Sequence, residues 1–133
     1  MGREFHAESP IYNIYTFEEQ KLYELGLHIL NDINSICLVY DKDGIQGMMA
    51  GCIYEQYFSY DTTAAELFLF ANKDKRGALI GKRLVTAFEL WASSMNAMEV
   101  CVGVSAGINP DRIVGFYEKM GYGNTSKQLR KVM

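Results

Sequence analysis

The sequence predicts an α/β fold in one domain, spanning residues 1–133, with a mixed β-sheet and helices on its faces. The first observation is the order of the elements: a strand hairpin comes first, and strand–helix units follow. The second is size, since 133 residues can bury roughly 65–70% of the unfolded surface, which suits one core. The third is an ordinary soluble composition, 49% hydrophobic and 22% charged.

The first half predicts a helix and three strands. The motif 16-TFEE-19 fits a capping box, and apolar residues at helical spacing follow it, which predicts a helix over 17–31. Two β-rich runs, 35–40 and 45–58, flank an Asp-Gly turn and predict an antiparallel hairpin. Residues 64–71 form the third predicted strand. Gly47 and Gly51 in the second run predict bulges or close backbone contacts.

The second half alternates helices with strands. A helix over about 79–94 carries the predicted core residues Leu84, Phe88 and Trp91. Residues 98–106 are apolar and predict a fourth strand, which a crossover helix would place parallel to 64–71. The pair Asn109-Pro110 predicts the start of a helix that ends near Gly121. Alternation over 125–132 predicts a final strand.

Composition narrows the class of partner and the compartment. The chain has 13 basic and 16 acidic residues, so no basic excess favours nucleic acid. No apolar run approaches the length of a membrane span or of a signal peptide. Cys37, Cys52 and Cys101 lie in strand-like runs and predict free thiols in a reducing, cytoplasmic compartment. With only His6 and His28 besides, no metal site is expected.

The stretch 74-DKRGALIGKRLV-85 predicts an anion site. Four basic residues surround Gly77 and Gly81 where a helix begins, and the first amides of a helix bind anions. A P-loop does not fit, because the glycine spacing is one residue short and Arg83 replaces the hydroxyl residue. The dinucleotide fingerprint is absent. An unrelated phosphate binder and a solvated basic loop both stay open.

Two stretches resemble the GNAT superfamily of acyl-CoA-dependent N-acetyltransferases: 66-ELFLFANKDKRGALIG-81 and 109-NPDRIVGFYEKMGY-122. The first is similar to the family signature R/Q-x-x-G-x-G/A, with Arg76 first and Gly81 last, although Leu79 replaces the first glycine. The second matches the Y-E-K-x-G-F/Y block. The resemblance covers roughly residues 35–132. It is closer still to small GNAT-like proteins of tailed phages, through 6-HAESPIY-12, 76-RGALIGKRL-84 and 88-FELWA-92, which implies the host cytoplasm.

The resemblance implies a GNAT-like fold and a cosubstrate. The fold would be a mixed, mostly antiparallel sheet with helices on both faces, and its N-terminal strand and helix would be missing or shortened. A second copy of the chain could cover the open sheet edge, so we rank a homodimer above a monomer. The cosubstrate would be acetyl-CoA, with no metal. The implied coenzyme-binding residues are Phe70, Ala71, Arg76, Gly77, Ala78, Leu79, Ile80, Gly81 and Lys82.

The resemblance also implies catalytic roles. The Tyr117 hydroxyl would donate to the leaving thiolate as a hydrogen-bond donor first and an acid second, because a tyrosine pKa of ~10 exceeds a thiol pKa of ~8.5. Glu66 is a candidate base, but strand alternation sends it to the wrong face unless a bulge intervenes. The other candidate bases are Glu55, Asp61, His6 and Glu8. The residues implied on the acceptor side are His6, Glu8 and Glu55.

The expected reaction moves an acetyl group from acetyl-CoA to a primary amine of a small molecule or protein. The alternative is a weak or inactive GNAT-fold protein that binds or inhibits another protein. Leu79, the shortened N-terminus and the lack of a clear base favour this alternative. Purely structural roles also stay open for these residues: Tyr117 in the core, Arg76 in a surface ion pair and Glu66 as a solvated strand residue.

Overall fold

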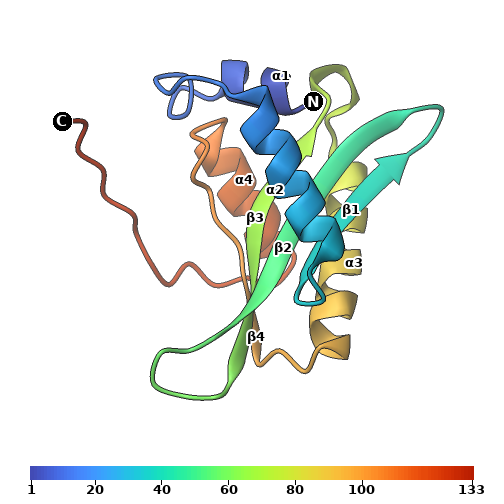
Figure 1. Cartoon of the computed structure of the whole chain (residues 1–133), viewed down its shortest axis with the longest axis vertical. Helices are drawn as coiled ribbons and strands as arrows, with labels where there is room; N and C mark the ends of the chain where they lie inside the picture. Colours follow the sequence, from blue (N-terminus) through green and yellow to red (C-terminus); the bar gives the residue numbers. More distant parts are fainter.

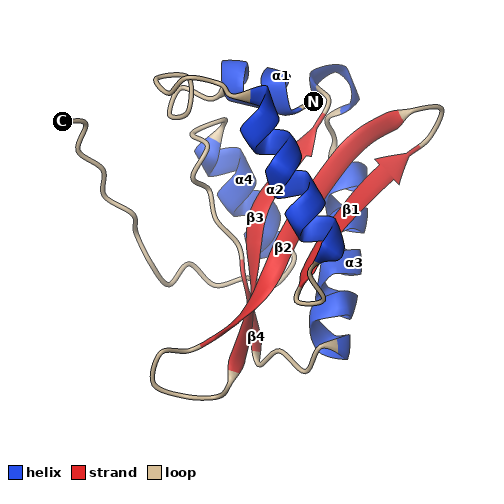
Figure 2. Cartoon of the chain, in the orientation of Figure 1, coloured by secondary structure: helices blue, strands red, loops and turns tan.

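The structure is a computed structural model that describes residues 1–133, except for the side chain of Ala78. A four-stranded sheet forms its centre, in the order β1 (Ser35–Asp41), β2 (Ile45–Glu55), β3 (Thr62–Ala71) and β4 (Glu99–Cys101). The pairs β1–β2 and β2–β3 are antiparallel, whereas β3 and β4 are parallel. The predicted hairpin and the mixed, mostly antiparallel sheet are confirmed (Figure 2).

Helices cover both faces of the sheet, as predicted. Helix α2 (Glu19–Asn31) crosses the front face in Figure 1, and α3 (Ala78–Ser94) lies behind the sheet. The core lies between the sheet and α3, and α4 (Pro110–Lys119) contributes Tyr117 to the same core. The fully buried members of this cluster include Met49, Val85 and Phe88.

The predicted close contacts at two glycines of β2 are confirmed. A Cβ atom at Gly51 would lie 2.4 Å from the ring of Phe88, and one at Gly47 would lie 2.6 Å from Ile80. Helix α3 can therefore rest directly on the backbone of β2, and this fixes where the helix begins relative to the sheet.

The chain before β1 differs in part from the prediction. Over residues 1–34 it forms no strand, and helix α1 (Gly2–Glu8), which has no apolar period, was not predicted. Helix α1 has seven residues. The predicted capping box is wrong, because α2 begins at Glu19 and its end carries no side-chain cap. The Glu19 carboxylate pairs instead with Arg3 of α1.

The end of the chain also differs. Strand β4 covers only Glu99–Cys101, not 98–106, because the chain then turns away from β3. The predicted strand over 125–132 is wrong, and Leu129 is 93% exposed. The tail runs away from the body in Figure 1. The pattern alone could not form a strand there, since a strand needs a ladder partner and β4 offers only three residues of edge.

Helix α4 begins where Asn109-Pro110 predicted, although the Asn109 side chain caps no amide. Gly121, with φ +95°, follows the end of this helix as predicted. Among the helices that the structure describes, none combines the length and apolar composition that a transmembrane span requires.

Candidate active site

A cleft opens where β3 and β4 diverge. The two strands pair only over 63–65 and 99–101, and beyond Ala65 the pairing ends. The exposed edge of β3, the segment 103–109 and helix α4 line a cleft of about 480 Å³. This volume lies within the usual range for small-molecule sites, ≈ 300–1,000 Å³.

A bulge in β3 turns Glu66 toward the base of this cleft. Ala50 pairs with Phe68, but Gly51 pairs with Glu66, so Leu67 is an extra residue. Without the extra residue, alternation would place Glu66 on the face opposite Leu69 and Ala71. The bulge returns the carboxylate to the α3–α4 side, which meets the condition that the sequence set for Glu66.

Glu66 and Tyr117 meet at the base of the cleft. The Tyr117 hydroxyl donates to Glu66 Oε2 at 3.2 Å, and the Gly103 amide donates to the same oxygen at 3.0 Å. Tyr117 is only 4% exposed. Water reaches the Glu66 carboxylate through the cleft, yet surrounding protein atoms desolvate it and raise its pKa, which the two hydrogen bonds partly offset.

The phenol of Tyr117 is held in its protonated form. Burial raises the Tyr117 pKa, and the negative charge of Glu66 raises it further. The pair thus offers one carboxylate that can accept a proton and one hydroxyl that keeps its own. Such a pair can remove a proton from a substrate while donating a hydrogen bond nearby.

The start of α3 has the geometry of an anion site. Gly77 precedes the first turn without a side-chain cap, and first-turn amides have no acceptor within their own helix. Of the predicted coenzyme residues, five line the cleft: Phe70, Ala71, Arg76, Gly77 and Gly81. Leu79 is 58% exposed and is not part of the lining, so its side chain does not obstruct the cleft.

The other predicted coenzyme residues lie beside the cleft. Ile80 is buried in the core, and Lys82 is exposed on the outer side of α3. Ala78 opens the helix, and its side chain lies outside the described part of the chain. The amides of Ala78 and Ile80 lie in the first turn of α3, where they have no acceptor within the helix.

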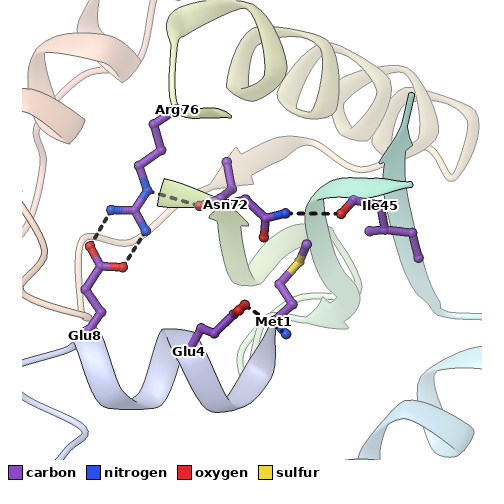
Figure 3. Close-up of polar contacts among 7 residues, drawn as sticks. Met1, Glu4, Glu8, Ile45, Asn72 and Arg76 are labelled. Atoms are coloured by element: carbon purple, nitrogen blue, oxygen red, sulfur yellow. Dashed lines mark hydrogen bonds and ion pairs between the residues drawn. The ribbon is translucent and has the colours of Figure 1, made fainter. Parts of the chain in front are cut away.

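Arg76 is joined to Glu8 of α1. Its guanidinium forms a two-pronged ion pair with the Glu8 carboxylate, and its Nε donates to the Ala71 carbonyl at 3.0 Å (Figure 3). The hydrogen bond from Arg76 lowers the Glu8 pKa. The sequence assigned these residues to different substrates, and the structure places them against each other. Contacts across 68 residues of sequence leave no local pattern that could reveal the pair.

The remaining candidates do not line the cleft. His6 Nε2 lies 2.8 Å from the Tyr15 carbonyl oxygen, and its ring packs against Phe17. Glu55 is exposed at the end of β2, opposite Thr62, and Asp61 binds Ser59 in the loop between β2 and β3. The described His, Cys, Asp and Glu side chains form no group of three that could hold a metal ion.

Residues 5–12, which we call the roof, cover one side of the cleft and were largely missed. The Tyr12 hydroxyl lies 2.7 Å from Ser105 Oγ, and the buried Ser9 hydroxyl donates to the Ala106 carbonyl at 2.5 Å. Phe5 and Tyr12 both line the cleft. The available signal was the stretch 6-HAESPIY-12, of which only His6 and Glu8 were carried forward.

Solved structures share this fold. A transcriptional regulator from Bacillus halodurans C-125 is 19% identical, with 98% of this chain and 89% of that chain covered and a TM-score of 0.77. Glucosamine-6-phosphate N-acetyltransferase from Arabidopsis thaliana is 18% identical, with 88% of this chain and 80% of that chain covered and a TM-score of 0.71. An aminoglycoside N-acetyltransferase in complex with CoA is 16% identical, with 86% of this chain and 87% of that chain covered and a TM-score of 0.70. Comparison with proteins of curated function finds no match.

The family itself is shown by sequence. The family model described as "Acetyltransferase (GNAT) domain" matches residues 33–123, which include the strands, the bulge and helices α3 and α4. The chain therefore belongs to the GNAT acetyltransferase domain family.

Proposed function

We propose that the protein is an N-acetyltransferase that moves an acetyl group from acetyl-CoA to a primary amine. One observation carries the proposal: the Glu66–Tyr117 pair lies at the base of an open cleft, where the β3 edge becomes free. A base and a hydroxyl donor at such a point suit acyl transfer to an amine, which needs both groups.

The chain offers a matching place for the coenzyme. The first-turn amides of α3 would hold the diphosphate, with Arg76 at the rim. The free β3 edge at Phe70 and Ala71 would bind the pantetheine arm as an added strand. Acetyl-CoA supplies the thioester from which the acetyl group comes.

Glu66 would accept the proton that the acceptor ammonium must lose, directly or through one water. The freed amine forms the new C–N bond as the C–S bond breaks, and a backbone amide near Phe70 would donate to the thioester oxygen. Protonation of Glu66 removes the negative charge that holds the Tyr117 hydroxyl. That hydroxyl can then donate to the departing sulfur, and the proton held by Glu66 neutralises the thiolate. The freed carboxylate would accept the second proton, which the nitrogen loses as the amide forms, and release it to solvent through the cleft.

The rival, an inactive binding protein, has lost two of its supports. Leu79 is exposed rather than inside the cleft, and Glu66 faces the cleft despite its position in the strand. The stretch 6-HAESPIY-12 supports a phage-encoded enzyme of the host cytoplasm. The open edge of the sheet supports a homodimer, which sedimentation would test.

Two measurements test the proposal. Calorimetry should show saturable binding of acetyl-CoA, and thiol release should depend on added amine. Tyr117→Phe should bind acetyl-CoA as the parent does but release thiol more slowly. Absence of acetyl-CoA binding at millimolar concentration, together with no thermal stabilisation, would refute the enzyme.

A further inference from the structure

Three aromatic rings form a continuous wall along one side of the cleft. The ring centroid of Phe5 lies 5.1 Å from that of Phe70 and 5.9 Å from that of Tyr12. All three side chains line the cleft, and the wall joins the end of β3 to the roof. A surface of this kind favours apolar or aromatic groups.

Few carboxylates are free beside this wall. Of the acidic side chains that the structure describes, Glu66 and Asp111 line the cleft. Asp111 lies in the first turn of α4, where the positive end of the helix dipole partly offsets its charge. Glu66 is the carboxylate at the base, where the reacting nitrogen must come.

Glu8 would be the next carboxylate, but Arg76 neutralises it. Both oxygens of Glu8 accept from the Arg76 guanidinium (Figure 3). Arg76 lines the cleft, whereas Glu8 does not. The guanidinium also lies 5.2 Å from the centre of the Phe70 ring, so the pair closes the end of the wall. A second ammonium on an acceptor would meet the positive side of this pair.

We infer that the acceptor is an amine with a single positive charge and an apolar or aromatic body, and that the Glu8–Arg76 pair excludes polyamines. This inference rests on the proposed function and names the substrate class of the same site. The apolar body packs along the Tyr12–Phe5–Phe70 wall while its one nitrogen reaches Glu66. A polycation fits poorly, because an ammonium buried without a partner is strongly unfavourable.

A matched pair of amines tests the inference. Hexylamine and 1,6-diaminohexane have the same length and differ by one charge. Their binding to the protein saturated with CoA, measured by calorimetry, needs no turnover. We expect hexylamine to bind about tenfold more tightly or better, which corresponds to about 1.4 kcal/mol. Equal binding, tighter binding of the diamine, or no binding of either amine overturns the inference.

Two variants assign the preference to the ion pair. Arg76→Gln frees the Glu8 carboxylate and should bring the affinity ratio of the two amines close to one. The double variant Arg76→Gln with Glu8→Gln removes that carboxylate again and should restore the preference for hexylamine. An unchanged ratio in Arg76→Gln overturns the role of the pair.

The wall has its own test. Phe5→Ala should lower the affinity for hexylamine by several-fold while leaving the affinity for methylamine unchanged. The melting temperature of the variant reports whether it folds. An equal loss of affinity for both amines would show that the wall does not bind the apolar body of the acceptor. A failure of the proposed function would be distinguishable from a failure of this inference. The proposed function is tested by acetyl-CoA binding and by thiol release with any amine, whereas the inference is tested by the relative affinities of the amines.

Discussion

The base of the cleft and its roof are held in place by different forces. The base is part of the core: Tyr117 belongs to the cluster of Phe88 and Val85, and the β2–β3 ladder fixes Glu66. The roof is held mainly by polar contacts and aromatic pairs, from Ser9, Tyr12 and Glu8 to segments far along the chain. The base should be rigid and the roof able to open, because local opening starts where few apolar contacts are made.

The largest expected effect lies in the base. Glu66→Gln removes the proton acceptor and should lower kcat by about 10²–10⁴-fold, the usual contribution of a general base. Because the Glu66 pKa is raised, parent activity should fall on acidification at a pH above the ordinary glutamate value of ~4.3. Steady-state rates across pH check both points. Glu89→Gln, which removes a carboxylate bound to Tyr122, is the matched control and should keep its rate.

The roof should respond in stability rather than in chemistry. Ser9→Ala leaves the Ala106 carbonyl and the Tyr12 amide without their partner, so we expect a loss of about 1–3 kcal/mol of unfolding free energy. The Michaelis constant for the acceptor should rise while kcat changes little. Urea unfolding and kinetics check this. Ser94→Ala, which removes an exposed hydroxyl bound to the Trp91 carbonyl, should be nearly neutral; an equal loss in both variants would show that Ser9 is not special.

The same contrast explains what the sequence could predict. Periodic apolar residues and turn signals lie close together in the chain, and they located β1, β2, β3, α2, α3 and α4 to within a few residues, except for the end of β2. The anion-type helix start was also predictable, because a glycine loop before an amphipathic helix is a local pattern.

The rest depended on long-range contacts. No local pattern shows that Leu67 is an extra residue, since the bulge exists only relative to β2. Helix α1 has no apolar period and is placed through Arg3, Phe5 and Glu8. The alternation over 125–132 resembled a strand, but no ladder partner was available for it.

Arg76 and Glu8 lie where the base meets the roof, and their variants should act in opposite directions. Arg76→Ala removes a positive charge from the coenzyme side and should weaken acetyl-CoA by about tenfold. Glu8→Gln releases the guanidinium from its ion pair and should increase the affinity for acetyl-CoA by a few-fold. Calorimetry measures both affinities. If Glu8→Gln also weakens the coenzyme, the roof is part of the coenzyme site and the two regions are not separate.

The smallest expected effect is on the free energy of unfolding, through the ionisation of Glu66 at the base of the cleft. The folded state raises the Glu66 pKa, so it binds this proton more tightly than the unfolded chain does. The stability gained from proton binding is fully present below the unfolded value of ~4.3 and is lost as pH rises through the folded value. Glu66→Gln cannot ionise, and it should therefore melt a few degrees above the parent at pH 8, with the difference vanishing near pH 4. Thermal unfolding at both pH values checks this. A variant that melts below the parent at pH 8 would mean that the bonds from Tyr117 and Gly103 outweigh desolvation, and that the base is held together by its charge rather than strained by it.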